Sequence, residues 1–111
     1  MKEGDIILAA ITQADGKIKK RPVVALREMP PYRDYLVCGI STQLRQEAPG
    51  FDEVILPLDT DFAASGLMAP SLIRLGFLSV VPDSQIFGSI GSISGERRCR
   101  LLERLSAYLL K

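Results

Sequence analysis

The chain has 111 residues, of which 47% are hydrophobic and 24% charged, and its formal net charge is +1. This length supports one compact domain over residues 1–111 and is too short for two. The composition is that of an ordinary globular protein, and the near-neutral charge does not by itself indicate a nucleic-acid partner. The lack of histidine excludes a Ser-His-Asp triad, a histidine acid/base pair and any histidine-ligated metal site.

The two cysteines and the hydropathy pattern predict a reducing, cytoplasmic location. Cys38 and Cys99 form no Cys-x-x-Cys pair, so we predict neither a structural zinc site nor another metal or cofactor. Both lie in apolar periodic segments, which favours buried free thiols over a disulfide or a nucleophile. No apolar run approaches about 18 residues and the N-terminus lacks a signal-peptide pattern, so no membrane association is expected.

The first half of the chain predicts short strands. An apolar run at 5–11 is too brief for a stable helix, and the turn signal at 15–16 follows it. A polar loop then leads into a strand at 23–26, which two consecutive prolines end. Residues 35–40, with β-branched and aromatic side chains, predict the next strand.

The second half continues in the same way. A Pro-Gly turn precedes a strand at 53–56, and a helical turn at 62–64 is expected to end near a glycine. Two further strands are predicted at 71–75 and 77–81. Residues 85–93 alternate apolar residues with glycine and serine, as in a strand or a loop packed close to other backbone.

The last segment predicts a helix that packs on the sheet. Ser94 is a suitable N-cap, and Glu96 suits the positive end of the helix dipole. One stripe is apolar and the opposite face is charged. The apolar stripe comprises Leu101, Leu102, Leu105, Tyr108 and Leu109, and the outward residues are mostly Arg97, Arg98, Arg100, Glu103 and Arg104. The predicted fold is therefore mainly β with a C-terminal helix, as a small, strongly bent antiparallel sheet or partly closed barrel.

Charge is divided unevenly along the chain. Residues 17–27 contain five basic side chains and no acid, whereas residues 47–61 contain five acids and no base. Such a division can present a basic face to a polyanion, although runs of charge are more often simply solvated surface.

The residues that suggest chemistry lie at two strand ends. Arg21 and Pro22 open the strand at 23–26, and Ser41-Thr42-Gln43 closes the strand at 35–40. If these strands pair antiparallel, both ends lie at the same edge of the sheet. A permanently charged guanidinium beside a hydroxyl pair makes a phosphate site, so RNA or nucleotide chemistry is the first hypothesis. The alternatives are a surface arginine and a turn in which the hydroxyls bond local backbone.

Taken together, these segments resemble the MazF/PemK family of bacterial type II toxins over nearly the whole chain. The resemblance is carried, in order, by Gly4-Asp5-Ile6-Ile7, Arg21-Pro22-Val23-Val24, Ile40-Ser41-Thr42-Gln43, Gly66-Leu67, Pro70-Ser71-Leu72-Ile73-Arg74-Leu75, Ile90-Gly91-Ser92-Ile93-Ser94 and the terminal helix. It implies an SH3-like barrel that forms a homodimer and sequence-specific, metal-independent cleavage of single-stranded RNA. It also implies neutralisation by a cognate antitoxin, in complex with which such a toxin can bind DNA.

The resemblance also implies catalytic residues. In the family the arginine of the Arg-Pro step is catalytic, and Arg21 matches it. The catalytic hydroxyl is usually a threonine, and Ser41 occupies that position here. Many relatives carry a carboxylate where this chain has Gly76, which predicts slow cleavage. Others place an aspartate at the next turn, and Asp83 is its approximate match. The catalytic candidates are thus Arg21, Ser41 and Asp83, with the acid/base partner left open.

RNA-binding candidates complete the prediction. Lys17, Lys19 and Lys20 lie in the loop that the family uses over RNA, and Thr42 and Gln43 belong to the hydroxyl-amide triplet. Two alternatives stay open: a catalytically weak or inactive module that binds RNA, and a related-barrel toxin acting on a protein target such as DNA gyrase. For the homodimer, the terminal helix and the segment at 71–75 are the expected contributors.

Overall fold

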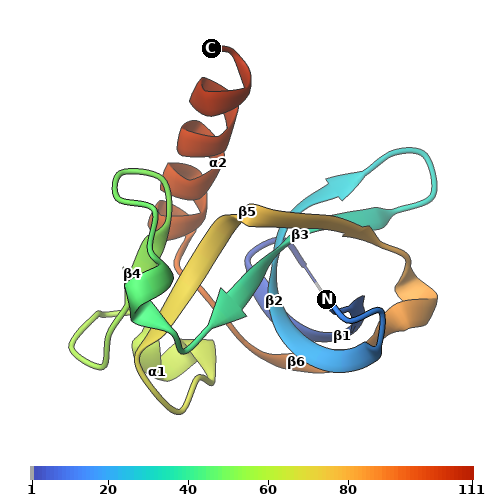
Figure 1. The fold of residues 1–111 in the computed structure, drawn as a ribbon, viewed down its shortest axis with the longest axis horizontal. Coiled ribbons are helices and arrows are strands. Elements are labelled where there is room, and N and C mark those ends of the chain that lie inside the picture. The colour runs from blue at the N-terminus through green and yellow to red at the C-terminus, as the bar shows by residue number, and fades with distance from the viewer. Residues whose placement is uncertain (1) are drawn as a thin grey trace.

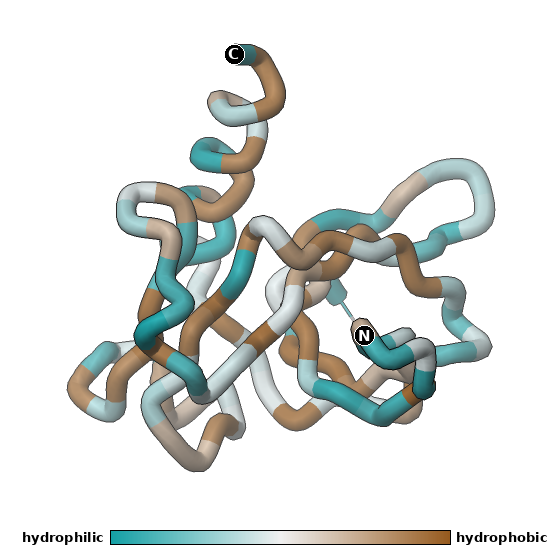
Figure 2. The backbone as a smooth tube through the Cα atoms, viewed as in Figure 1, coloured by the Kyte–Doolittle hydropathy of each residue, from teal (hydrophilic) through white to brown (hydrophobic). Residues whose placement is uncertain are grey.

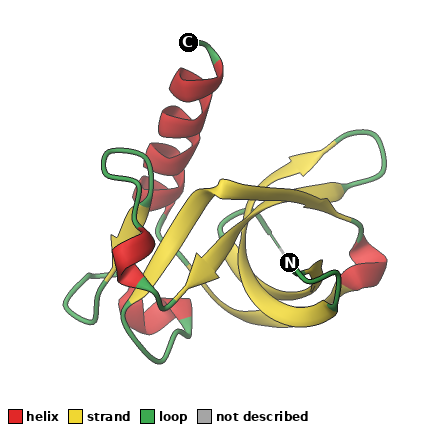
Figure 3. Cartoon of the chain, viewed as in Figure 1, coloured by secondary structure: helices red, strands yellow, loops and turns green. Residues whose placement is uncertain are grey.

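The structure is a computed structural model that describes residues 2–111. A bent six-stranded antiparallel sheet in the order β4-β5-β3-β2-β1-β6 forms its body (Figure 1). The strands are β1 (Asp5–Thr12), β2 (Ile18–Met29), β3 (Asp34–Ser41), β4 (Glu53–Ile55), β5 (Ser71–Val81) and β6 (Ile86–Ser92). The helices are η1 (Leu44–Gln46), α1 (Phe62–Ser65), η2 (Asp83–Gln85) and α2 (Gly95–Leu109) (Figure 3). The predicted mainly β fold with a C-terminal helix is confirmed.

Each face of the sheet carries a buried core, which explains why β1, β3 and the middle of β2 read as nearly continuous apolar runs. Successive side chains on a strand point to opposite faces. On β2, Val23 therefore joins one cluster inside the curved sheet, with Ile7 and Val37 among its members. Its neighbour Val24 joins a second cluster, which includes Leu101 of α2. The curvature thus encloses one core, and the helix covers the other.

Two strands, β2 and β5, differ from the prediction by more than a one-residue shift at an end. Strand β2 begins at Ile18 rather than at residue 23, because residues 18–20 pair with the end of β1 in an exposed hairpin that needs no apolar side chains. Strand β5 is one bent strand, not two. Its pairing with β3 jumps from Cys38–Leu78 to Gly39–Arg74, so extra residues on β5 form a bulge that bends the strand without ending it.

Helix α2 begins where predicted, but only part of its apolar stripe packs on the sheet. The Ser94 hydroxyl oxygen accepts a hydrogen bond from the Arg97 backbone N–H at 3.1 Å, which caps the helix. Leu101 and Leu105 are buried against the sheet, whereas the hydrophobic C-terminal end of the helix stands away from it (Figure 2). Among the described residues, no helix has the length and apolar character needed to cross a bilayer.

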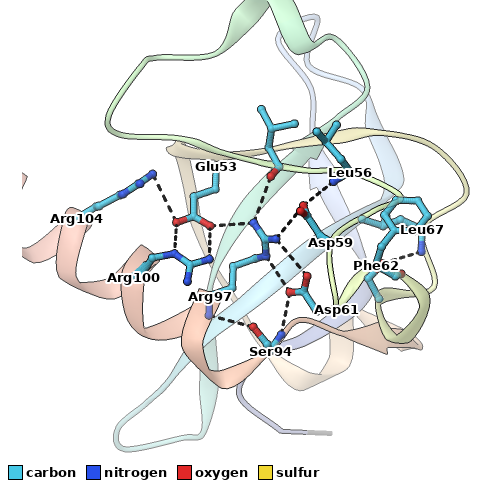
Figure 4. A network of polar contacts seen from close by, with 12 residues as sticks. Glu53, Leu56, Asp59, Asp61, Phe62, Leu67, Ser94, Arg97, Arg100 and Arg104 are labelled. Atoms are coloured by element: carbon cyan, nitrogen blue, oxygen red, sulfur yellow. Dashed lines mark hydrogen bonds and ion pairs between the residues drawn. The ribbon is translucent and has the colours of Figure 1, made fainter.

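The prediction that Arg97 faces solvent is wrong, because it is the centre of a buried ion-pair cluster (Figure 4). Its Nε and Nη2 donate to both carboxylate oxygens of Asp61, at 2.8 and 3.1 Å, and its Nη1 donates to Glu53 at 2.9 Å. Asp59 accepts a further bond from Nη2 at 3.2 Å. Burial alone raises the pKa of Asp61, but hydrogen bonds from Arg97 and the Ser94 N–H outweigh it and lower that pKa. The cluster ties α2 to the segment from β4 to α1.

Both cysteines are free thiols, but only one is buried. Burial of Cys38 raises the pKa of its thiol far above the ordinary value. The expectation that Cys99 is buried is wrong, because this side chain lies on the outer face of α2, where its Sγ donates to Glu103 at 3.3 Å. A hydrogen bond from a thiol to a carboxylate stabilises the neutral form, so the pKa of Cys99 is raised as well.

Candidate functional site

The two predicted strand ends meet at a cavity of about 520 Å³ at the mouth of the curved sheet. Strands β1, β2, β3 and β5 and the loops after β3 and α1 all contribute residues to it. The polar and charged lining consists of Gln13, Arg21, Ser41, Thr42, Gln43, Gln46, Ser71 and Arg74. We call this cavity the groove.

Strand register brings Arg21 and Ser41 to the same side of the sheet. Val23 of β2 pairs with Gly39 of β3 in the antiparallel ladder. Continuing that register by two residues on each strand sets Arg21 opposite Ser41, with both side chains on the face of Val23 and Gly39. Both residues line the groove. The prediction that these strand ends lie together is confirmed, while their catalytic roles stay predictions.

Gln13 holds the Arg21 guanidinium in place. The Nη2 atom of Arg21 donates a hydrogen bond to Gln13 Oε1 at 3.1 Å. The amide of Gln13 in turn donates from Nε2 to the Ile11 carbonyl oxygen at 3.2 Å, which sets which way the amide points. A neutral amide orients the guanidinium without neutralising its charge, so the charge stays available to a ligand. The sequence prediction missed Gln13, because it lies just after β1 and meets Arg21 only across the hairpin.

Arg74 is a second groove cation that the sequence prediction did not include among the site residues. Arg74 lies on β5 and pairs with Gly39 of β3, so its side chain shares the groove face, and it is half-buried. Within residues 2–111, no ion pair or side-chain hydrogen bond joins its guanidinium to another residue. The available signal was a charged residue inside the buried run from Ser71 to Leu75, since such residues are rarely buried unpaired without a function.

The hydroxyl-amide triplet lines the groove in full. Ser41 Oγ accepts a hydrogen bond from the Gln43 backbone N–H at 3.0 Å, which is the local turn that the alternative reading anticipated. That bond occupies one lone pair, so the hydroxyl can still donate its hydrogen to a bound group. Thr42 and Gln43 are exposed and offer further donors and acceptors.

The three lysines lie near the groove but do not line it. Lys19 shares the sheet face of Arg21 by strand alternation, and it pairs with the groove residue Ile11. Lys20 points to the opposite face, where its Nζ lies 4.5 Å from the centroid of the Phe87 ring. Lys17 sits in the turn, and its backbone N–H donates to Asp15. Of the three, Lys19 is therefore best placed to meet a ligand that extends beyond the groove.

Asp83 does not line the groove, so the structure does not bring this catalytic candidate together with Arg21 and Ser41. It lies in η2, beyond Val81, which pairs with Tyr35 at the far end of β3 from Ser41. Tyr35 and Ser41 are six residue steps apart on β3, which at about 3.3 Å per residue is about 20 Å along the strand. Asp83 instead lines a separate hollow with Tyr32, Arg33 and Tyr35.

Gly76 also lies away from the groove. It lines a third cavity, between β5 and α2, and an added Cβ there would meet no atom within 4 Å. Within residues 2–111, the lining of the groove includes no carboxylate, cysteine or tyrosine. The described residues likewise contain no cluster of three or more acidic, cysteine or histidine side chains suited to a metal ion. The groove therefore offers two cations, hydroxyls and amides, but no conventional general base.

A family model described as "PemK-like, MazF-like toxin of type II toxin-antitoxin system" matches residues 2–109. The chain belongs to this toxin family. Among solved structures, the fold is similar to that of the Mycobacterium tuberculosis toxin MazF-mt6, with a TM-score of 0.69 and 24% sequence identity over 95% of each chain. No curated protein sequence gives a significant match. Membership of the PemK-like, MazF-like family implies that this toxin has an antitoxin partner.

Proposed function

We propose that this PemK-like, MazF-like toxin is a metal-independent endoribonuclease that cleaves single-stranded RNA in the groove. The observation that carries the proposal is that Arg21, Arg74 and the Ser41 hydroxyl line one cavity that no carboxylate neutralises. Guanidinium groups bind phosphate through parallel N–H donors, and they keep their charge at every accessible pH. RNA and the antitoxin are both made in the cytoplasm, which is the compartment that the proposal requires.

In the proposed reaction, the RNA supplies its own nucleophile. The 2′-oxygen forms a bond to the adjacent phosphorus, and the bond from phosphorus to the 5′-oxygen breaks. The 2′-hydroxyl proton passes to water or hydroxide, and the leaving 5′-oxygen takes a proton from water. The products are a 2′,3′-cyclic phosphate and a 5′-hydroxyl. Arg21 and Arg74 stabilise the charge that develops on the phosphoryl oxygens, and Ser41 donates a hydrogen bond to the same group.

The lining of the groove predicts a slow enzyme with a distinctive pH dependence. General acid–base assistance is typically worth about 10²–10⁴-fold, and within residues 2–111 the groove lining includes no carboxylate, cysteine or tyrosine to provide it. Activation of the 2′-hydroxyl then depends on hydroxide. The cleavage rate should rise about tenfold per pH unit up to the pH at which the protein unfolds, instead of passing through a bell-shaped optimum.

The proposal includes a homodimer, formed through the cavity of about 760 Å³ between α2 and β5. Phe51, Leu75 and Leu78 line it together with the C-terminal part of α2. Tyr108 and Leu109 are 55% and 68% exposed, so a second copy could cover them. In the proposed dimer the segment at 71–75 offers little surface to a second copy, because four of its five residues are buried within the protomer. A purely monomeric mass by light scattering at tens of micromolar would contradict the dimer.

The experiment is cleavage of single-stranded RNA in EDTA, with the chemical ends of the products identified. Wild type should yield the cyclic phosphate and the 5′-hydroxyl. Arg21→Ala and Arg74→Ala should each lower the rate by about 10²–10³-fold, the usual cost of removing one preorganised donor to a developing oxyanion. Arg33→Gln is the matched control, because it removes one exposed positive charge outside the groove. Folded Arg21→Ala protein with near wild-type activity would overturn the assignment.

A further inference from the structure

Within residues 2–111, the lining of the groove includes one aromatic ring, and this ring packs on backbone that carries no side chain. Phe77 of β5 lies against Gly39 of β3, a buried residue in the middle of the sheet. A Cβ added to Gly39 would lie 3.0 Å from Cδ1 of Phe77 and 3.2 Å from Cγ. These separations are tighter than ordinary van der Waals contact, so the ring occupies the space that a side chain at residue 39 would need. The absence of a side chain at Gly39 therefore allows the ring to pack directly on the backbone of β3.

The bulge in β5 places the Phe77 ring against Gly39. Gly39 pairs with Arg74, whereas the preceding residue of β3 pairs with Leu78. Three residues of β5 are thus inserted between successive pairs, and Phe77 is the last of them. Phe77 therefore lies over Gly39. On the other side of β3, Gly39 pairs with Val23 of β2, which is two residues from Arg21. The ring and Arg74 thus lie at Gly39 of β3, and Arg21 lies at the next position on the same face, opposite Ser41.

Phe77 is not used as a core residue. It is 37% exposed and lines the groove, whereas the core residues that flank it on the sheet, such as Val23 and Leu75, are at most 1% exposed. An exposed ring beside cations is how proteins bind single-stranded nucleic acid: the cations hold the phosphates, and the unstacked bases stack on the ring. The side-chain amides of Gln43 and Gln46 also line the groove, where they can reach the polar edge of a stacked base.

Building on the proposed function, we propose that Phe77 is the stacking platform for the nucleobase next to the phosphate held by Arg21 and Arg74. Stacking needs a base that is free of its own neighbours, so this residue selects single-stranded over duplex RNA. It acts by positioning the strand and takes no part in proton transfer or charge stabilisation.

Binding to uncleavable RNA tests the proposal separately from catalysis. The probes are short 2′-O-methyl oligoadenylate and oligouridylate, which lack the attacking hydroxyl, and the same oligomers with abasic ribose in place of each base in turn. A 2-aminopurine reporter in the oligoadenylate detects stacking directly by fluorescence quenching. Homopolymers suffice because stacking tolerates any base. Wild type is compared with Phe77→Leu and Phe77→Tyr, and circular dichroism checks that each variant is folded.

We expect Phe77→Leu to weaken binding of the intact oligomers by about 5- to 150-fold and to abolish their advantage over the abasic forms. Phe77→Tyr keeps the ring and should stay within about threefold of wild type. The salt dependence of binding should be unchanged in Phe77→Leu, because the phosphate contacts remain. Gly39→Ala offers a second test that leaves the ring in the protein: its methyl group should displace the ring and reduce the quenching.

The results also separate this proposal from the endoribonuclease proposal. If Phe77→Leu and Gly39→Ala keep both the preference for intact bases and the quenching, while Arg21→Ala weakens binding of every oligomer, the stacking role is overturned and RNA binding stands. If wild type binds none of the oligomers, both proposals fail. Loss of the base preference in Phe77→Leu with its retention in Phe77→Tyr supports the stacking role.

Discussion

The arginines of the buried cluster and the arginines of the groove use the same side chain in opposite ways. Arg97 is surrounded by carboxylates, and each of its three side-chain nitrogens donates to at least one of them. Arg21 has one neutral partner, Gln13, and the side chain of Arg74 has no recorded partner within residues 2–111. In the cluster, carboxylates neutralise the arginine and the ion pairs stabilise the fold. In the groove, the positive charge of the arginines is not neutralised and can bind a ligand.

This difference gives the uneven charge distribution a structural meaning. Carboxylates of the acidic run at 47–61 bind arginines of α2: Arg97 meets Asp61, and Arg100 donates to Glu53 at 2.9 Å. Carboxylates of the acidic run are thus paired with arginines of α2. They therefore do not neutralise the basic side chains at 17–27. A net charge of +1 for the whole chain therefore coexists with a locally cationic groove.

Removing the central arginine of the cluster should have the largest effect. Arg97→Ala leaves the buried carboxylate of Asp61 without its bidentate partner, and breaking a buried ion pair from one side typically costs about 3–5 kcal/mol of unfolding free energy. Urea denaturation measures this loss. Arg100→Ala is the matched control, because its side chain is 47% exposed and its buried partner Glu53 keeps the bond to Arg97, so the loss should stay at about 1 kcal/mol. Arg21→Ala should change stability by no more than about 0.5 kcal/mol. A similar loss in all three variants would contradict the contrast.

Acid should weaken the cluster before it affects the groove arginines. The pKa of Asp61 is lowered in the folded protein, so the unfolded chain binds this proton more readily. The stabilisation is therefore fully present above the unfolded value of about 3.9, and it is lost as the pH falls through the folded value. One such group gives a slope of at most about 1.4 kcal/mol per pH unit. Urea denaturation between about pH 5 and pH 2 should show this loss, and Asp61→Asn should reduce the slope. An unchanged slope in that variant would show that other carboxylates, such as Glu3, dominate.

The sequence predicted the elements better than it predicted their partners. Turn residues and apolar periodicity located the apolar parts of β1 to β4, and Ser94 located the start of α2, because these signals are local. The same signals divided β5 into two strands and left residues 85–93 open between a strand and a loop. Arg21 and Ser41 could be placed together because they lie on neighbouring strands of one hairpin. Arg74 was not predicted as a site residue, because its place in the groove depends on a pairing with Gly39, which lies 35 residues earlier in the chain.

The wrong predictions have the same origin. Arg97 was expected in solvent because helical periodicity treats charge as exposure, yet its partner Asp61 lies 36 residues earlier in the chain. Asp83 was a catalytic candidate because it matches an aspartate that relatives carry at this turn, although the pairing of Val81 with Tyr35 carries the turn to the end of β3 opposite Ser41. Residues whose neighbours come from distant segments could not be assigned from local patterns.

The smallest expected effect comes from making the groove resemble the cluster. Gln13→Glu replaces the neutral partner of Arg21, now 3.1 Å from its Nη2, with a carboxylate. The new ion pair is exposed and worth up to about 1 kcal/mol, so RNA affinity should fall by about two- to fivefold. The dependence of binding on salt should weaken by about one phosphate contact, because Arg21 would exchange a phosphate for the glutamate. Gln46→Glu is the matched control, since it adds the same charge to the groove lining with no recorded bond to Arg21. If both variants lower the affinity and the salt dependence equally, the added charge acts on the groove as a whole, and the specific role of Gln13 in keeping Arg21 available is wrong.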